Sequence, residues 1–332
     1  MFRRIYKFIK WTLIIVALLA AFFYFRFKPA EDIAWGVNFS IPQANYLGFD
    51  WEKMYLAILD DLTPQRLRIM AYWEILEPER GEYKFDDIDF LLAEAGKRDI
   101  PVILVLGHKQ PRWPECHHPD WYEGLSDDEK EEALLAVLGA SVEHFKKYDS
   151  ISAWQIENEP LFPYGPDCRI VKFGTFRKEL ALVKSLDDRP MVVTDSGEKG
   201  AWLPSTWAGG DIFGSTMYRE VYYDQKQKYV KYPIPTALYR VKAGMVQTLS
   251  RVDKIWGVEL QAEPWFETTV HETPWERQKE LMNPDKFAAN VAYATSVGFE
   301  ENYFWGVEWW YWARQHGYPE MWEAAKKLMS EQ

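Results

Sequence analysis

The sequence predicts a (β/α)8 barrel, because short apolar segments alternate with amphipathic ones along most of its 332 residues. Eight apolar segments recur after residue 28, and helical patterns lie between most of them. Strand–helix alternation indicates a parallel sheet, and eight such units fit a barrel of roughly 250 residues plus insertions. The alternative is an open doubly wound sheet, which needs a glycine-rich phosphate-binding turn after its first strand. Residues Gly36–Phe39 (GVNF) do not have that pattern.

Residues 1–28 are expected to form a separate segment that directs the chain to a membrane. An uncleaved anchor needs roughly 20 apolar residues, and Phe8–Phe27 reaches this length if Lys10 and Arg26 extend to the lipid headgroups. A cleaved signal peptide is the alternative, but it needs small residues at its end, where this chain has FFYFRF. A buried helix is the third interpretation. The basic residues before the apolar run place the rest, residues 29–332, outside the cytoplasm as one barrel.

The expected elements follow in chain order. The strands are Ile33–Phe39, Arg66–Tyr72, Val102–Leu106, Ile151–Ile156, Met191–Thr194, Ile212–Met217, Ile255–Leu260 and Tyr303–Val307. Amphipathic helices are expected over Trp51–Leu62, Asp86–Arg98, Asp127–Lys147, Phe173–Leu186 and Pro284–Val297. Ser126 followed by Glu129, and Asn283 followed by Pro284, are typical helix N-termini.

Composition and charge exclude several classes of protein. Outside residues 1–28, 33 basic residues stand against 50 acidic ones, a net charge of -17, whereas nucleic-acid binding needs basic stripes. The cysteines form no C-x-x-C pair and the histidines form no H-E-x-x-H motif, so the sequence indicates no metal site. Aromatic residues are abundant, with 17 Trp, 19 Tyr and 19 Phe, which suits a large core or an aromatic-lined binding cleft.

The ends of the expected strands, where a barrel carries its chemistry, hold mostly carboxylates and aromatics. Glu159 follows the fourth strand and Glu259 ends the seventh. Two carboxylates that face each other over a cleft can hydrolyse a glycosidic bond. One protonates the leaving oxygen, and the other attacks the anomeric carbon or activates water. A separation of about 5–5.5 Å gives retention of configuration.

Four segments resemble those of clan A glycoside hydrolases, the superfamily of cellulase-like and β-galactosidase-like barrels. They are LRIMAYW (Leu67–Trp73), WEILEPERGEYKFDDID (Trp73–Asp89), WQIENEP (Trp154–Pro160) and IWGVELQAEPW (Ile255–Trp265). The resemblance implies that Glu159 is the general acid/base and that Asn158 contacts the sugar 2-hydroxyl. It also implies that Arg68 lies near the nucleophile and that the substrate is a β-linked carbohydrate.

The seventh strand offers two candidates for the nucleophile. Glu259, Gln261 and Glu263 alternate along one strand, so all three are expected to face the barrel interior. Glu259 follows a short apolar strand, and its ELQAEPW context resembles the β-galactosidase-like pattern. We therefore expect Glu259 to be the nucleophile, with Glu263 as the alternative. Glu157 is expected to be a structural carboxylate paired with a base such as Arg68.

The resemblance assigns further residues to the sugar site. Tyr218, at the end of the sixth strand, corresponds to a tyrosine that hydrogen-bonds the nucleophile. His108, after the third strand, resembles a histidine that lines the sugar site, with a structural histidine as the alternative. Trp305 and Trp309 belong to YFWGVEWWYW, where we expect one or two side chains to form a floor for a sugar ring. The alternative is that these tryptophans fill space between barrel and helices.

The two cysteines follow neighbouring strands. Cys116 comes after the third strand and Cys168 after the fourth, and adjacent loops can bring them within disulfide distance in an extracytoplasmic protein. Two unpaired thiols are the alternative.

Together these patterns predict a membrane-anchored, retaining glycoside hydrolase with a carbohydrate substrate. No cofactor is expected, because two carboxyl groups with suitably different pKa values suffice for the reaction. A transglycosylase that remodels surface glycans would share every catalytic residue. A non-catalytic carbohydrate-binding barrel would lose one of the carboxylates, and here both are present, although residue identity alone does not establish function.

Overall fold

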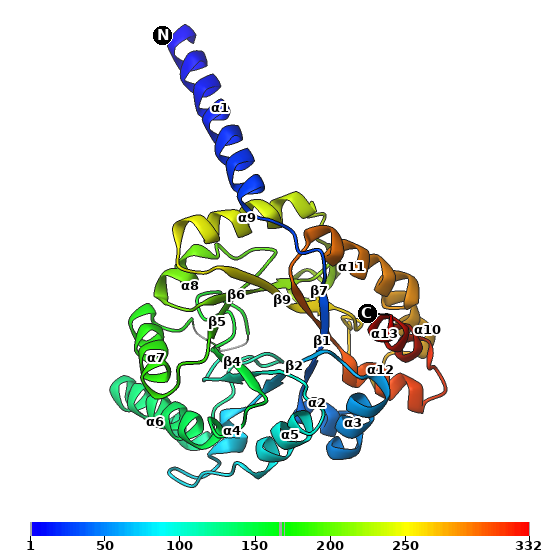
Figure 1. Ribbon diagram of the computed structural model, residues 1–332. Coiled ribbons are helices and arrows are strands. Elements are labelled where there is room, and N and C mark those ends of the chain that lie inside the picture. The colour runs from blue at the N-terminus through cyan, green and yellow to red at the C-terminus, as the bar shows by residue number, and fades with distance from the viewer. Residues whose placement is uncertain (1, 166–167, 169, 332) are drawn as a thin grey trace.

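The structure, a computed structural model that describes residues 2–165, 168 and 170–331, confirms the predicted barrel (Figure 1). Eight parallel strands close in the order β1-β10-β9-β6-β5-β4-β3-β2. They are β1 (Ala34–Phe39), β2 (Arg66–Met70), β3 (Val102–Leu106), β4 (Ile151–Ile156), β5 (Met191–Asp195), β6 (Ile212–Met217), β9 (Lys254–Gln261) and β10 (Glu301–Trp305). Each bound lies within two residues of its expected position, so apolar periodicity located the strands well.

Helices surround the strands and cover their outer faces (Figure 1). The longer ones are α3 (Trp51–Ala57), α5 (Asp86–Gly96), α6 (Asp127–Phe145), α7 (Phe173–Leu186), α9 (Thr236–Leu249), α11 (Pro284–Val297), α12 (Val307–Gln315) and α13 (Glu320–Ser330). Shorter ones are α2 (Ile41–Tyr46), α4 (Trp73–Leu76), α8 (Leu203–Ala208) and α10 (Trp275–Leu281). Both expected helix starts are present. Ser126 forms a capping box with Glu129, and the Asn283 side chain accepts from the Lys286 N–H.

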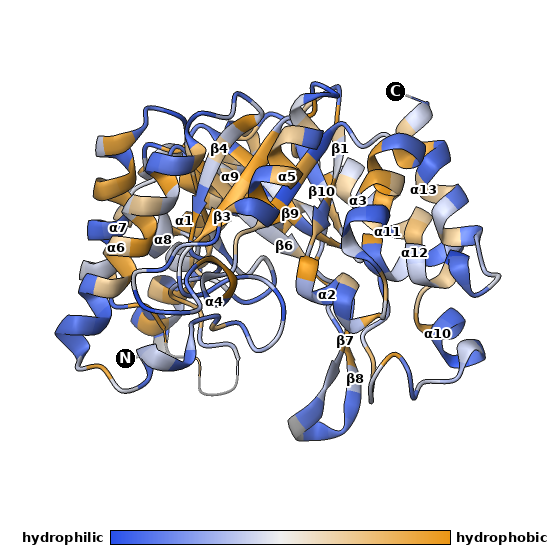
Figure 2. Cartoon of the chain, turned by 90° about the horizontal axis from the view of Figure 1, so that it is seen from below, coloured by the Kyte–Doolittle hydropathy of each residue, from blue (hydrophilic) through white to orange (hydrophobic). Residues whose placement is uncertain are grey.

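Two features differ from the expected elements. The helix expected over Trp51–Leu62 continues as a π-helical turn over Ile58–Leu62 and ends at Thr63, whose φ is 48°. A short antiparallel hairpin of β7 (Glu220–Tyr223) and β8 (Lys228–Lys231) was not predicted. Figure 2 shows this hairpin projecting on the same side as α4, where the barrel strands end. Its strands are short and polar, so no apolar pattern marks them.

The barrel interior is filled in two layers. The lower layer is apolar and consists of Ile103, Ala153, Val192, Ile212, Trp256, Val258 and Tyr303. Above it, toward the ends of the strands, the buried side chains become polar, and they include Asn38, Arg68 and Gln155. The change from apolar to polar places the charged side chains at the mouth of the barrel, the side on which barrel enzymes carry their chemistry.

The N-terminal helix α1 (Phe2–Arg26) extends away from the barrel (Figure 1). Within the described residues, Arg3–Arg26 is the one helix long and apolar enough to cross a membrane, with a mean hydropathy of 2.2 and no burial in the protein. Its last turns contact α9. A Cβ on Gly244 would lie 1.8 Å from the carbonyl oxygen of Phe23, and Arg240 donates to the Tyr24 hydroxyl at 3.1 Å. The absence of a side chain at Gly244 therefore lets the two helices approach closely.

Candidate functional site

Arg68 organises the polar layer at the mouth of the barrel. Its side chain is completely buried, and it comes from the middle of β2. Nε donates to Gln155 Oε1 at 2.8 Å, and Nη2 donates to Asn158 Oδ1 at 3.0 Å. Nη1 donates to Asn38 Oδ1 at 2.8 Å and to Glu259 Oε1 at 2.9 Å. One guanidinium thus links side chains from β1, β4 and β9 and fixes their orientation.

A β-bulge on β9 positions Glu259. The pairing of β6 with β9 matches Ser215 with Gly257, and the next residue, Thr216, with Glu259. Val258 is therefore the extra residue of the bulge. Bulges change the direction of side chains and are frequent beside active sites. Here the bulge brings the Glu259 carboxylate into the interior, where its residue is only 5% exposed.

Glu259, Gln261 and Glu263 follow the bulge and alternate along the strand, but their side chains have different partners. Gln261 Oε1 accepts from the backbone N–H groups of Arg219 and Glu220 at 2.8 and 3.0 Å, so this side chain holds the base of the β7–β8 hairpin. Glu263 lies beyond the end of β9. Only Glu259 contacts Arg68 among these three.

Tyr218 completes the surroundings of Glu259. Its hydroxyl donates to Glu259 Oε2 at 2.9 Å, so each carboxylate oxygen has a donor from the side chain of a different strand end. Burial, followed by the charge of Glu259, raises the pKa of Tyr218 well above its ordinary value. Tyr218 therefore stays protonated and keeps donating to the carboxylate. Both oxygens of the Glu259 carboxyl group therefore accept a hydrogen bond from a fixed side chain.

Glu159 lies just after β4 in a different environment. Its backbone is left-handed, with φ 45°, a strained conformation for a residue with a side chain. The backbone is held by Thr194 Oγ1, which accepts from the Glu159 N–H at 2.7 Å, and by Lys109 Nζ, which donates to the Glu159 carbonyl at 3.0 Å. Burial and then the charges of Glu259 and Glu115 raise the pKa of Glu159 well above its ordinary value, against the opposing effect of Lys109. Both effects favour the protonated carboxyl group, which is the form that a general acid needs.

Glu263 belongs to a separate ionic cluster at the rim. Arg112 Nη1 donates to Glu263 Oε1 at 2.6 Å, and Arg112 Nη2 donates to Glu308 Oε2 at 2.8 Å. Burial alone would lower the pKa of Arg112, but Glu263 and Glu308 together raise it above its ordinary value. The same guanidinium lies 4.2 Å from the centre of the Trp305 ring. Trp305 therefore lies at the mouth of the barrel, with one region of its ring covered by Arg112.

Two predicted sugar-binding residues lie elsewhere. Trp309 is buried on α12, where its Nε1 donates to Gln278 Oε1 at 2.8 Å and its ring stacks against Trp275. It packs between barrel and helices, which corrects its placement at the sugar floor. His108 packs against Trp73, His118 and Tyr122, and its Nδ1 lies 4.0 Å from the sulfur of Cys116. Burial lowers the pKa of His108 to about 3, so it is neutral, and the structural alternative describes it better.

Glu157 is structural, but it does not pair with Arg68. Its oxygens accept from the backbone N–H groups of His108, at 2.9 Å, and Lys109, at 2.5 Å. A Cβ on Gly107 would lie 2.7 Å from the Glu157 carboxyl carbon, so glycine is needed there for this close approach. Burial raises the pKa of Glu157 to about 7, although those two backbone groups oppose the shift. The carboxyl therefore holds the loop after β3 against the end of β4.

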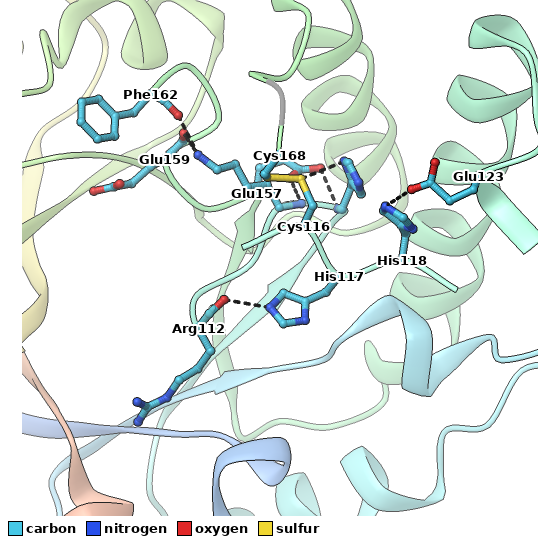
Figure 3. Close-up of a disulfide and its surroundings, with 11 residues drawn as sticks. Arg112, Cys116, His117, His118, Glu123, Glu157, Glu159, Phe162 and Cys168 are labelled. Carbon is cyan, nitrogen blue, oxygen red and sulfur yellow. Dashed lines mark hydrogen bonds and ion pairs between the residues drawn. A yellow bond between two sulfur atoms is a disulfide. The ribbon is translucent and has the colours of Figure 1, made fainter. Parts of the chain in front are cut away.

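A disulfide joins the loop after β3 to the loop after β4. Cys116 and Cys168 are bonded, with a Cα–Cα distance of 5.3 Å. Figure 3 shows the bridge between the two loops, with the Glu159 side chain pointing away from it. Within residues 2–165, 168 and 170–331, no three His, Cys, Asp or Glu side chains are grouped so that they could hold a metal ion.

Three charged residues near the site were missed by sequence reasoning: Lys109, Arg112 and Glu115. All three belong to the loop after β3. Their placement depends on left-handed backbone at Arg112 and Glu115 and on a cis peptide bond between Trp113 and Pro114. Neither feature leaves a periodic pattern in the sequence. The one available signal was the Trp-Pro pair, because cis peptide bonds occur almost only before proline.

Comparison with known proteins supports the fold. No family model matches the chain, and no curated protein matches its sequence. Among solved structures, xylanase 10B from Thermotoga maritima is similar at a TM-score of 0.59 and 15% identity, over 95% of this chain and 98% of that one. The exo-β-1,4-mannosidase Op5Man5 from Opitutaceae bacterium strain TAV5 is similar at 0.57 and 14% identity, over 83% of this chain and 52% of that one. This chain therefore spans about half of the mannosidase.

A third similar structure is endo-glycoceramidase II from Rhodococcus sp., solved as a lactosyl-enzyme intermediate. Its TM-score is 0.53 at 15% identity, over 83% of this chain and 75% of that one. At these identities the comparisons show the fold, and the resemblance to clan A glycoside hydrolases expected from the sequence is confirmed at that level. The chain has the parallel eight-stranded barrel on which these glycoside hydrolases are built.

Proposed function

We propose that this protein is a retaining glycoside hydrolase that cleaves a β-linked oligo- or polysaccharide outside the cytoplasm, with Glu159 as general acid/base and Glu259 as nucleophile. The observation that carries the proposal is the contrast between two buried carboxyl groups at the ends of β4 and β9. One has its pKa raised well above the ordinary value. The other is bonded to a guanidinium and a tyrosine hydroxyl. In a pair of carboxyl groups, such a contrast supports one group as the proton donor and the other as the nucleophile or base.

The first half of the reaction follows from these charge states. Glu159 transfers its proton to the glycosidic oxygen as the bond to the leaving group breaks. Glu259, held in place by Arg68 and Tyr218, attacks the anomeric carbon from the opposite face and forms a glycosyl-enzyme. The solved lactosyl-enzyme of the Rhodococcus endo-glycoceramidase shows such an intermediate in a protein of the same fold.

The second half reverses the roles. Glu159, now ionised, removes a proton from water as the water oxygen attacks the anomeric carbon, and Glu259 leaves as a carboxylate. Arg68 Nη2 donates to the Oδ1 atom of Asn158, so the amide N–H2 group is the part of Asn158 that can donate a hydrogen bond. Trp305 at the barrel mouth supplies an apolar face for the ring.

Azide rescue tests both roles at once. The full-length chain is incubated with aryl β-glycosides that carry an activated leaving group, alongside Glu159→Ala, Glu259→Ala and Glu263→Ala. We expect both Glu159→Ala and Glu259→Ala to lose activity by roughly 10³-fold or more. With azide, Glu159→Ala should then form the β-glycosyl azide and Glu259→Ala the α-glycosyl azide.

Glu263→Ala is the matched control, because its carboxylate binds Arg112 and not Arg68. It should retain the stereochemistry and most of the activity of the wild type. Loss of activity in Glu263→Ala with full activity in Glu259→Ala would move the nucleophile to Glu263. Glycan binding without turnover of any glycoside would favour a non-catalytic barrel.

We also propose that α1 remains attached as a membrane anchor. The residues that follow it are built into the barrel: Phe27 is 6% exposed and packs edge-on against Phe299, and the Ala30 N–H donates to the Gly298 carbonyl at 2.9 Å. The close crossing of α1 with α9 at Gly244 adds a fitted contact within the helix itself. Cleavage before Lys28 would remove the contacts of Phe27 with Phe299 and of α1 with Gly244, whereas an anchor keeps both.

A further inference from the structure

Helix α9 presents an apolar face to the outside of the barrel. Its sequence, TALYRVKAGMVQTL, contains no acidic residue, whereas residues 29–332 carry a net charge of -17. Four apolar side chains recur at helical spacing on one face, and none of them is buried: Leu238, Val241, Met245 and Leu249. Leu238 and Leu249 are 43% and 48% exposed. The outer face of a surface helix is normally polar, and a contiguous apolar one marks a site of interaction.

The helix α1 identifies the partner of this face, because it crosses α9. A Cβ on Gly244 would lie 1.8 Å from the carbonyl oxygen of Phe23, and Arg240 donates to the Tyr24 hydroxyl at 3.1 Å. A membrane-spanning helix needs about 20 residues, so an anchor uses the whole apolar run Phe8–Phe27. Phe23 and Tyr24 then lie at the end of the span. The part of α9 that they touch is therefore at the surface of the bilayer.

The connection between α1 and the barrel is too short to act as a tether. Only seven residues separate the end of α1 from the start of β1. The first and the fourth of these, Phe27 and Ala30, are already fixed on the barrel, where Phe27 packs against Phe299 and Ala30 donates to the Gly298 carbonyl. The barrel therefore cannot move away from the membrane on a flexible linker, and its orientation depends on how α1 meets α9.

The β7–β8 hairpin, which precedes α9, has a composition typical of a membrane interface. Residues 222–231 (YYDQKQKYVK) hold three lysines, three tyrosines and one acidic residue. Lys226 and Lys199 each lie 5.4 Å from the centre of the Tyr223 ring. Tyrosine is enriched where proteins meet lipid headgroups, and lysine extends its charge to that level. Figure 2 shows the hairpin and the N-terminal end of α1 on the same side of the barrel, so an anchored α1 brings the hairpin toward the bilayer.

We propose that the outer face of α9 and the β7–β8 hairpin form one surface that lies on the lipid headgroups of the bilayer in which α1 is inserted. The proposal rests on the proposed role of α1 as an anchor and adds an orientation to it. The apolar side chains of α9 enter the boundary between headgroups and acyl chains, and the hairpin lysines reach the lipid phosphates. Because α1 alone keeps the chain attached, changes on this surface alter the orientation of the barrel and not its attachment.

A glycan chain bound along the hairpin is the competing occupant, because tyrosine rings offer an apolar face to sugars as well. The lipid surface is favoured because the hairpin leads directly into α9, and α9 contacts the anchor helix. A glycan would also leave the apolar face of α9 without a partner. The two occupants differ in one observable, which is whether the surface is in contact with lipid when no carbohydrate is present.

A fluorescent label tests this contact in the full-length chain. The two cysteines of the sequence are bonded to each other, so one added cysteine is the single thiol that takes a nitrobenzoxadiazole label. Lys228→Cys places the label on the hairpin, and Leu238→Cys places it on α9. Lys53→Cys is the matched control, because this side chain is 79% exposed and belongs to α3, across the barrel from α9 (Figure 1).

Each labelled protein is reconstituted into vesicles of phosphatidylcholine and phosphatidylglycerol, with and without a lipid that carries a nitroxide on its headgroup. The labels of Lys228→Cys and Leu238→Cys should emit at shorter wavelength than the label of Lys53→Cys, and only these two should be quenched by the nitroxide. Adding Leu238→Asp and Leu249→Asp to the Lys228→Cys protein should abolish the quenching of the hairpin label, because two charges on the α9 face oppose its contact with lipid. This protein should still float with the vesicles.

Three labels with the same emission and no quenching would overturn the proposal, and flotation with the vesicles would show that the anchor stands without it. Quenching of the hairpin label that persists with both aspartates would overturn the assignment of the α9 face. If the full-length chain does not float with the vesicles, the anchor fails, and the surface fails with it. None of these measurements depends on turnover, so the roles proposed for Glu159 and Glu259 are tested separately.

Discussion

The two candidate catalytic residues are both glutamates, so their different surroundings distinguish them. Glu259 is bonded to Arg68 at 2.9 Å and to Tyr218 at 2.9 Å. Glu159 receives neither contact, and burial, followed by the nearby charges of Glu259 and Glu115, raises the pKa of Glu159. The negative charge of Glu259 thus helps to keep the proton on Glu159.

Replacing Tyr218 by phenylalanine tests the contribution of its one hydrogen bond to Glu259. Tyr218→Phe removes the hydroxyl that donates to Glu259 Oε2 and leaves the ring, which packs edge-on against Trp265. A hydrogen bond to a charged group contributes about 1.5–3 kcal/mol, so kcat should fall roughly 10- to 150-fold. Steady-state kinetics on an activated aryl β-glycoside measure this loss.

The control is Tyr222→Phe, in the hairpin, whose hydroxyl donates to Gln227. It should leave the rate unchanged. A Tyr218→Phe variant with the kcat of the wild type would show that the hydrogen bond to Glu259 does not contribute to the reaction.

At the scale of single residues, the sequence predicted the positions of strand residues better than those of loop residues. Arg68, Glu159 and Glu259 lie on or shortly after barrel strands, so barrel closure brings them to the same mouth, although the bulge on β9 sets the direction of Glu259. Arg112 and Glu115 reach the same mouth only because their loop has left-handed backbone at both positions. Such backbone is rare for residues with a side chain, and nothing in the local pattern of apolar residues indicates it.

At the scale of elements, two buried carboxyl groups lie between the end of strand β4 and helix α7. Glu157 follows β4, and Glu179 lies on the buried face of α7 with no exposed surface. Neither carboxylate oxygen of Glu179 has a hydrogen-bond partner among the described residues. Burial and then the charge of Glu157 raise the pKa of Glu179 well above its ordinary value, and burial raises the pKa of Glu157 to about 7. The burial of this pair therefore favours a retained proton.

This pair should make stability depend on pH. Both folded-state pKa values exceed the unfolded value of about 4.3, so the folded state binds more protons between about pH 4.5 and 7. The stabilisation that comes from this extra proton binding is complete below the unfolded pKa, and it is lost as pH rises through the folded pKa values. Glu179→Gln removes one of the two carboxyls and supplies a permanent donor to Glu157.

The variant should therefore gain stability over the wild type at pH 8, by roughly 1–3 kcal/mol, and gain much less at pH 4.5. Thermal unfolding of both proteins across this range measures the difference in Tm. Glu143→Gln is the control, because this carboxylate on α6 is 53% exposed and pairs with Lys146. An equal change in Tm at both pH values would mean that the pair does not titrate in this window.

Buried apolar elements were predicted more accurately from the sequence than elements whose position depends on contacts between distant residues. The barrel strands are buried and apolar, so their bounds were predicted within two residues. The hairpin of β7 and β8 is held by contacts from elsewhere, chiefly the Gln261 side chain, which accepts from Arg219 and Glu220. The bulge at Val258 likewise arises from the pairing of β6 with β9. Contacts between distant residues decide both features, and periodicity along the chain does not report them.

At the scale of the whole molecule, the chain combines an acidic barrel with a basic, apolar N-terminal helix. The net charge is -11 overall but -17 outside residues 1–28, because six basic residues lie in that segment. Basic residues before an apolar helix favour an orientation in which they stay in the cytoplasm. In the proposed orientation the barrel lies outside the cytoplasm, where a disulfide such as Cys116–Cys168 is stable. Helix, charge and disulfide are consistent with one location.

Fractionation of cells that express the full-length chain tests the anchor. If α1 is retained, the barrel should sediment with membranes, resist extraction by high salt and by alkaline carbonate, and have the intact mass of the uncleaved chain.

Leu18→Lys combined with Leu19→Lys places two charges in the apolar helix, and inserting each charge near the centre of a membrane helix costs roughly 2.5–3.5 kcal/mol. This variant should release the barrel from the membrane, whereas Leu249→Lys, an equally exposed leucine on α9, should not. A soluble chain whose mass corresponds to a start near Lys28 would instead identify α1 as a cleaved signal peptide, and the contact at Gly244 would then have no role in the mature protein.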